Sequence, residues 1–351
     1  MDLSSITKEN VRFESHKIRL NRLLKSANKV SPPVHFETIG FSEQKEPITG
    51  IIIGNGPSKI SLLAGSHADE PVGPETLHVF IESVLSHPTQ FKEFLEQFTF
   101  FIIPHINPDG ENKNWKWITL FPDLHALIKH RYRELPGRDI EFGYPDMRPE
   151  NYAASSWWKK HAPFDMHINL HGMSFSEGAL LLIDRHSVNQ TSDIRDEFQK
   201  YITSTGFGFH DHDRNGEKGF RKITKGISTT PESDKMKELF LKNGDQATAS
   251  EFKKNSMEFL REFNKSLVSI VTEFPLYKLP STAEESPGIP KNYITWQKLN
   301  PKLQHLIATG KATDGLISKV QFQHVPLKQN IMMQLKVIQL GLQHATSCQK
   351  S

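Results

Sequence analysis

Short apolar runs alternate with amphipathic stretches along the first 280 residues of the chain. The runs end at Gly, Pro or polar residues and predict β-strands at 35–40, 48–54, 59–64, 98–103, 166–170, 179–183 and 267–271. Apolar residues spaced three or four apart predict helices at 10–27, 74–85, 90–97, 192–204 and 248–264. The pattern is that of an open α/β sheet, which binds ligands in the crevice at the carboxyl ends of its strands.

Three stretches interrupt this pattern. Residues 111–149 show little periodicity and are rich in Trp, His, Arg and Pro, which favours a functional loop over a linker. The Asn-Pro-Asp-Gly sequence just before them, at 107–110, is typical of a tight turn. Residues 280–291 are rich in Pro, Ser and Glu and predict a linker or a wrap-around loop. Beyond it, 330–342 predicts an amphipathic helix that packs on the domain or on a second subunit.

The composition narrows the class of protein. A chain of 351 residues with 36% hydrophobic and 24% charged residues is soluble and globular in type. A net charge of +3 over this length gives no indication of a nucleic acid or membrane partner. The single cysteine, Cys348, excludes an internal disulfide and a Cys-based metal cluster. Residues 1–30 do not resemble a secretory signal, and no run of about 18 apolar residues is present, so we expect a cytoplasmic protein.

Polar side chains suited to metal binding and proton transfer follow three of the apolar runs. His67 and Glu70 come directly after the run at 59–64, and imidazole with carboxylate suits Zn²⁺. Taken alone this signal is weak, because roughly one His-x-x-Glu is expected by chance in such a chain. His171 stands at the end of the run at 166–170 and is a second candidate ligand. Glu273 follows the run at 267–271, where desolvation raises a carboxyl pKa toward that of a general base.

Two other histidine positions have different interpretations. His167 lies within its strand pattern and is interpreted as a structural histidine with satisfied hydrogen bonds. The sequence His-Asp-His-Asp at 210–213 allows a second metal site, but such clusters are more often solvated loops, which is the interpretation we favour.

Together these motifs resemble the zinc carboxypeptidases of the carboxypeptidase A type over roughly 35–280. The resemblance consists of His-x-x-Glu followed by Glu-Pro-x-Gly at 70–73, Asn-Pro-Asp-Gly at 107–110 and Pro-Glu at 149–150. It continues with a strand that ends in Leu-His-Gly at 170–172 and a late strand that ends in Glu273. From this resemblance we expect three parts in the chain, which are an N-terminal helical segment (1–34), a catalytic domain (35–280) and a partly helical C-terminal extension (281–351).

The resemblance implies a fold and a site. The fold is α/β, a single α/β/α domain with a mixed, mostly parallel twisted sheet. His67, Glu70 and His171 are expected to hold one Zn²⁺ and to leave a position for water. Glu273 is expected to act as the base on that water and to return the proton to the leaving amine. An arginine shares the oxyanion charge, with Arg133 preferred over Arg131 by spacing.

The chain departs from the family pattern where the substrate end is bound. Family members usually read Gly-x-Asp-x-Asn-Arg, and Asn and Arg clamp the terminal carboxylate of the substrate. Here Gly-Arg-Asp-Ile at 137–140 matches, but Glu141 and Phe142 take the clamp positions, and no tyrosine between 201 and 277 replaces the family's mobile capping tyrosine. We take Glu141, Phe142 and Asn107 as candidate substrate-binding residues.

The departure has two interpretations. The first, slightly favoured, is that Glu141 meets an amine or amide donor, so that the substrate end is neutral or cationic. The second is that another arginine provides the carboxylate clamp, the candidates being Arg138, Arg148, Arg214 and Arg221.

The predicted function is therefore a zinc-dependent hydrolase of an amide or peptide bond with altered recognition of the substrate end. The nearest alternative is a deacylase of the succinylglutamate desuccinylase and aspartoacylase type, which acts on N-acyl amino acids. A catalytically inactive, zinc-bearing binding module is a further alternative, and the carboxylate of Glu273 argues against it. The sequence leaves the oligomeric state open.

Overall fold

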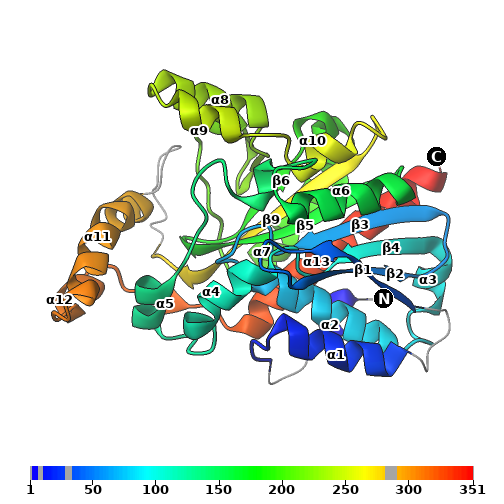
Figure 1. The fold of residues 1–351 in the computed structure, drawn as a ribbon, viewed down its shortest axis with the longest axis horizontal. Coiled ribbons are helices and arrows are strands. Elements are labelled where there is room, and N and C mark those ends of the chain that lie inside the picture. Colours follow the sequence, from blue (N-terminus) through cyan, green and yellow to red (C-terminus); the bar gives the residue numbers. More distant parts are fainter. Residues whose placement is uncertain (1, 7–10, 28–33, 281–290, 351) are drawn as a thin grey trace.

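A ten-stranded mixed sheet runs through the middle of the computed structural model, which describes residues 2–6, 11–27, 34–280 and 291–350 (Figure 1). Its order is β1 (Val34–Phe41), β2 (Pro47–Ile53), β4 (Phe98–Ile103), β3 (Ser58–Ala64), β5 (Met166–Ser176), β9 (Val268–Lys278), β6 (Leu180–Ile183), β8 (Ile227–Thr229) and β7 (Lys222–Thr224), and β10 (Gln323–His324) pairs with β9. The four central strands β4, β3, β5 and β9 run parallel, while β1, β2 and β6 join the sheet in antiparallel pairs. The expected α/β fold with a mixed sheet is confirmed.

Helices cover both faces of this sheet because alternate side chains of its strands point to opposite sides. On one face, the side chains of Ile60 and Leu62 join a core with α2 (Val72–Ser86), α7 (Ser192–Thr205) and α13 (Leu327–Lys350). On the other face, Leu63 and Ile103 pack with α6 (Pro149–His161) and α10 (Ser256–Leu260). Figure 1 shows α1 (His16–Ala27) outside α2 and, across the sheet, α6.

The remaining elements are short, apart from α11. They are η1 (Leu3–Ile6), α3 (Lys92–Gln97), α4 (Pro108–Ile118), α5 (Leu124–His130), η2 (Ile140–Phe142), η3 (Arg185–Gln190), η4 (Glu217–Gly219), α8 (Ser233–Lys242), α9 (Gln246–Glu251), α11 (Lys291–Ala308) and α12 (Asp314–Ile317). Within the described ranges, none of these helices or the longer ones has the length and apolarity to cross a membrane.

Three local predictions were wrong. Asn-Pro-Asp-Gly does not form an isolated turn but begins α4: Asn107 is the N-cap and accepts a hydrogen bond from the Gly110 N–H, and Pro108 takes the first helical position. The segment 111–149, expected to be irregular, therefore contains most of α4 and all of α5. The helix expected at 248–264 is instead divided into α9 and α10, because Asn255 and Glu258 form a capping box that starts a new helix.

The strands β5 and β9 are longer than their apolar runs. His171 pairs in register with Glu273, and the parallel pairing continues to Ser176 and Lys278. Their neighbour β3 stops at Ala64, which pairs with Leu170. His171 and Glu273 therefore lie inside their strands, at the level where β3 gives way to the loop that carries His67, and not at strand ends as predicted.

The C-terminal helix α13 supports this part of the sheet. Its Gln334 donates a hydrogen bond to the main-chain oxygen of His171 at 2.9 Å and accepts one from the Thr76 hydroxyl of α2 at 2.6 Å. α13 is longer than the helix predicted at 330–342. Residues 281–290 of the predicted linker and the side chain of Cys348 lie outside the described part of the structure.

The N-terminal helix α1 is attached to α2 through buried polar side chains. His16 Nδ1 lies 2.9 Å from His78 Nε2, and its main-chain N–H donates to Glu111 at 3.0 Å. Arg19 forms ion pairs with Glu75 and Glu82 of α2. Burial lowers the pKa of His16 to about 4, because a charged imidazole cannot be solvated there.

This burial predicts an acid-dependent loss of stability. The unfolded chain protonates His16 near pH 6.5 and the folded protein only near pH 4, so its contribution is complete above pH 6.5 and is lost as the pH falls toward 4. In urea unfolding from pH 7 to pH 4, the stability of the wild type relative to His16→Phe is expected to fall by about 3 kcal/mol. Acid release of metal affects both proteins alike. Parallel stability curves for the two proteins would contradict the prediction.

Candidate active site

The loop after β3 is shaped by two glycines. Gly65 has a φ of +78°, and a Cβ there would lie 2.6 Å from the His105 ring, so the turn requires glycine. A Cβ at Gly73, near the start of α2, would lie 2.4 Å from the main-chain oxygen of Leu170. These two positions allow the loop that carries His67 and Glu70 to pass close to β5.

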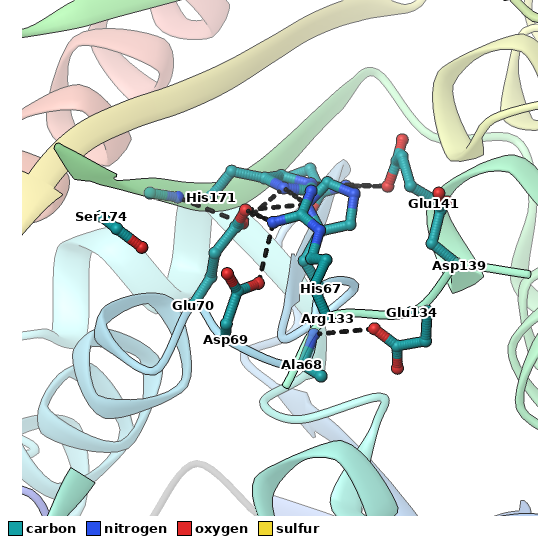
Figure 2. Close-up of polar contacts among 12 residues, drawn as sticks. His67, Ala68, Asp69, Glu70, Arg133, Glu134, Asp139, Glu141, His171 and Ser174 are labelled. Carbon is teal, nitrogen blue, oxygen red and sulfur yellow. Dashed lines mark hydrogen bonds and ion pairs between the residues drawn. The ribbon is translucent and has the colours of Figure 1, made fainter. Parts of the chain in front are cut away.

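His67, Glu70 and His171 converge on one point (Figure 2). The Nδ1 atoms of His67 and His171 are 3.0 Å apart. Glu70 lies between them, with Oε1 2.9 Å from His67 Nδ1 and Oε2 2.8 Å from His171 Nδ1. Within the described residues this is the only group of three potential ligands whose donor atoms all lie within 4.8 Å of one another. The Glu70 and His171 side chains are buried, and that of His67 is largely buried.

This donor set fits a zinc ion. Two imidazoles with one carboxylate form a set that catalytic zinc sites use, and three protein ligands leave a coordination position open. Burial alone would raise the pKa of Glu70, but His67, Arg133 and His171 outweigh it and hold that pKa well below its usual range. The ligand carboxylate is therefore ionised, as metal binding requires.

Glu141 lies on the far side of the His171 ring from Glu70. Its Oε2 is 3.4 Å from His171 Nε2 and accepts a hydrogen bond from Asn169 at 2.8 Å, while its Oε1 accepts one from the Ser256 hydroxyl at 3.2 Å. The residue is only 4% exposed. A carboxylate at Nε2 fixes the proton on that nitrogen and leaves Nδ1 free for a metal. Asp139, drawn near Glu141 in Figure 2, caps η2 through the Phe142 N–H.

The two candidate oxyanion arginines reach the same group. Arg133 Nη1 donates to Asp69 Oδ1 at 2.8 Å and to Glu70 Oε1 at 2.7 Å, and 41% of its side chain is exposed. Arg131 Nη1 donates to the Ser174 hydroxyl at 3.0 Å. Both arginines line the cavity beside the three ligands.

Asn107 does not line this cavity, which corrects its prediction as a substrate-binding residue. Besides capping α4, it donates a hydrogen bond to Glu134 at 2.6 Å, and Glu134 accepts one from the Ala68 N–H at 3.3 Å. Asn114 of α4 contacts the main-chain oxygens of Ala68 and Tyr132 at 2.9 Å each. The Asn-Pro-Asp-Gly motif and the helix it begins thus hold the His67 loop and the arginine segment together.

Glu273 lines the same cavity from β9. Burial, with a further contribution from the neighbouring Glu70, raises its pKa to about 8. The shift is that of a carboxyl group in a poorly solvated site, the setting in which a carboxylate becomes a useful general base.

The cavity has a volume of about 570 Å³, within the usual range of ligand sites. The predicted residues His67, Glu70, Arg131, Arg133, Glu141, Phe142, His171 and Glu273 all line it. Part of its apolar lining comes from Leu180 and Leu182 of β6, Met257 of α10 and Val271 of β9, which form one hydrophobic cluster. Lys218 and Arg214 add two cations.

The segment 210–213 is irregular, as the favoured prediction of a loop implies, but it is only partly solvated, because His210 is buried while the other three residues are partly exposed. His210 is fully buried and its Nδ1 lies 2.8 Å from Glu177, while Asp211 accepts from Lys222 at 2.7 Å. Within the described ranges, no third ligand gathers with His210 and His212. His167, as predicted, is structural: its ring lies between the hydroxyls of Ser61 and Ser256 at 3.0 and 3.1 Å.

The sequence did not indicate which residues contact the candidate site residues and hold them in place. The pairing of Asp69 with Arg133 and the contacts of Asn114 join segments far apart in the chain. The apolar lining comes from several separate elements, so no local pattern indicates it. One available signal was the family-like Gly-x-Asp at 137–139, which places Asp139 near the metal ligands.

Comparison with known proteins gives one family match and several similar folds. Residues 20–141 match the family model described as zinc carboxypeptidase. A metallo-carboxypeptidase from Burkholderia cenocepacia superposes with a TM-score of 0.54 at 11% identity, covering 96% of this chain and 70% of that one. Two candidate metallopeptidases superpose with TM-scores of 0.53. The Shewanella denitrificans protein is 12% identical, with 97% of each chain covered; the Shewanella amazonensis protein is 14% identical, with 94% and 96% covered.

The fold is like that of solved metallo-carboxypeptidases, and His67, Glu70 and His171 form a candidate metal site within it. The structural likenesses, at such low identity, concern the fold. The matched segment carries His67 and Glu70, while His171 and Glu273 lie beyond it. The resemblance to the zinc carboxypeptidases predicted from the sequence is confirmed by the family model over residues 20–141 and by the fold.

The site predicts which substitutions remove the metal. In zinc analysis of the purified protein, His171→Ala is expected to lower zinc affinity at least a hundredfold, because it removes one of three ligands. The matched control His186→Ala changes an exposed histidine outside the cavity and should retain the wild-type zinc content. Equal zinc retention by both variants would contradict the assignment of His171.

Proposed function

We propose that this chain is a zinc-dependent hydrolase that cleaves a peptide or other amide bond, with one zinc ion per chain and Glu273 as the general base. One observation carries the proposal: His67, Glu70 and His171 converge at the wall of a cavity that Glu273 also lines. Each of the three segments that carry these side chains is far from the others in the sequence, which favours a built site over a chance cluster.

His67, Glu70 and His171 would hold the ion, which when bound polarises the substrate carbonyl and lowers the pKa of water. Glu273 accepts a proton at its carboxylate and returns it to the leaving nitrogen. Arg133, or Arg131 beside it, donates hydrogen bonds to the oxygen that becomes negative. Arg133 is preferred because it already donates to the Glu70 carboxylate.

Glu141 has a supporting role in this proposal. Its carboxylate faces His171 Nε2 and receives hydrogen bonds from Asn169 and Ser256. It therefore keeps the His171 ring in the tautomer and orientation that metal binding needs. A substrate amine would have to displace these buried contacts, which argues against Glu141 as the group that binds the substrate end.

The match of residues 20–141 to the zinc carboxypeptidase family favours a peptide substrate over an N-acyl amino acid. An inactive binding module would not need an ionisable carboxyl group with a raised pKa beside the ligands. A screen of short peptides against N-acyl amino acids with the zinc-loaded protein separates peptidase from deacylase. Exclusive turnover of the N-acyl amino acids would replace the peptidase assignment.

The role of Glu273 is tested by Glu273→Gln, which keeps the shape but removes the base. We expect kcat for a peptide substrate to fall roughly a thousandfold while zinc content stays at the wild-type level. Glu251→Gln changes an exposed carboxylate outside the cavity and should leave both unchanged. Loss of zinc from Glu273→Gln would make the residue a ligand, and unchanged turnover would exclude it as the base.

A further inference from the structure

The C-terminal extension forms one wall of the cavity. The residues of α11 that line it are spaced three or four apart, on one face of the helix, and are Tyr293, Trp296, Gln297 and Asn300. The helix lies outside residues 20–141, which match the zinc carboxypeptidase family model, and outside the resemblance found in the sequence. The family match and the sequence motifs therefore give no information about this wall.

Contacts with three parts of the fold hold α11 in place. The centre of the buried Trp296 ring lies 4.2 Å from that of Phe175 on β5. The centre of the Tyr293 ring lies 5.3 Å from that of His210, which is itself buried and lies 2.8 Å from Glu177. The helix also packs against α5 (Figure 1). The wall is thus a fixed part of the folded domain.

The strands β5 and β9 give the distance between this wall and the candidate metal site. His171 pairs in register with Glu273, and Phe175, four residues further along β5, pairs with Tyr277. Alternate residues of a strand point to the same face, so Phe175 lies on the face that carries His171. At about 3.3 Å per residue, the contact with Trp296 lies about 13 Å beyond His171 along the strand. An extended peptide of about four residues spans that length.

The site divides the cavity into two ends that differ in chemistry. At one end, the apolar cluster includes Val271, two residues before Glu273 on β9. Toward the other end, Arg131 donates a hydrogen bond to the hydroxyl of Ser174, three residues after His171 on the parallel strand β5. In the proposed reaction Glu273 serves the leaving nitrogen and the arginines serve the carbonyl oxygen. The part of the substrate that carries the carbonyl group therefore extends toward α11.

We propose that α11 limits the length of the substrate, so that the enzyme acts on short acyl chains, with at most about four residues on the carbonyl side of the cleaved bond. This inference rests on the proposed hydrolase function and specifies its substrate class. A longer chain meets the buried ring of Trp296, and moving that ring would break its aromatic contacts with Phe175 and Phe322. Longer acyl chains are therefore excluded.

A ladder of peptide hydroxamates tests this limit by binding alone. A hydroxamate group at the carboxyl end of an acetylated alanine peptide binds the zinc ion, which fixes the peptide on the carbonyl side of the site. The ladder runs from one alanine to eight and is titrated by calorimetry into zinc-loaded Glu273→Gln protein. We expect affinity to fall at least tenfold once the chain exceeds about four alanines, because the excess residues have no room.

Substitutions in the wall should move the limit in both directions. Tyr293→Ala with Gln297→Ala enlarges the cavity at α11 and should restore at least tenfold of the affinity lost by the longest hydroxamate. Gln297→Trp, which enlarges the wall, should weaken binding of the four-alanine hydroxamate. The matched control Lys298→Ala changes an exposed residue of the same helix outside the cavity and should leave the limit unchanged. A general loosening of α11 would not produce opposite effects.

Turnover separates this inference from the hydrolase function. Zinc-loaded protein with Glu273 intact is given acetylated alanine peptides of increasing length, and mass spectrometry identifies each cleaved bond. We expect kcat/KM to fall at least tenfold for bonds with more than about four residues on their carbonyl side. Equal affinity along the ladder, no hydroxamate binding, or a limit that the wall substitutions leave unchanged overturns the proposal. Length-limited binding without turnover of any peptide or N-acyl amino acid would leave the wall standing and reject the hydrolase.

Discussion

The structure depends on one buried carboxylate. Glu70 lies between two imidazoles and also accepts from Arg133, so its negative charge is compensated by side chains from three separate segments. Removing such a charge from water is costly unless it is paired or binds a metal. Three parts of the fold must therefore come together at this point. They are the loop after β3, the strand β5 and the segment that follows α5.

Residues other than the three candidate ligands also hold these segments in place. Gln334 of α13 bonds to the main chain of His171, and Asn114 of α4 holds the loop of His67 against the arginine segment. Glu141 contacts Nε2 of His171, on the side of the ring away from Glu70, and so orients that ring. Elements from the middle and the end of the chain thus position one small group of atoms, which is how rigid sites are built.

The sequence predicted the sheet and the side chains that gather at the candidate metal site because each rests on a local signal. Apolar runs indicated the strands, and the polar residues that follow them indicated His67, His171 and Glu273. Asn107 was misinterpreted because Asn-Pro-Asp-Gly fits both a turn and a helix start, and only tertiary packing selects the helix. Glu141 was interpreted as a substrate-binding residue because the sequence does not reveal its three buried partners, which come from β5 and α10, far away in the chain. Arg214 was one of four equivalent arginines until the fold placed it in the cavity.

The central claim is that three side chains from two segments far apart in the chain share one metal ion. Anomalous diffraction from crystals of the zinc-loaded protein, recorded on both sides of the zinc absorption edge, tests it most directly. The account predicts one strong anomalous peak per chain, within bonding distance of Nδ1 of His67, Nδ1 of His171 and the Glu70 carboxylate. A peak at a different set of ligands, or His171 found remote from His67, would contradict it.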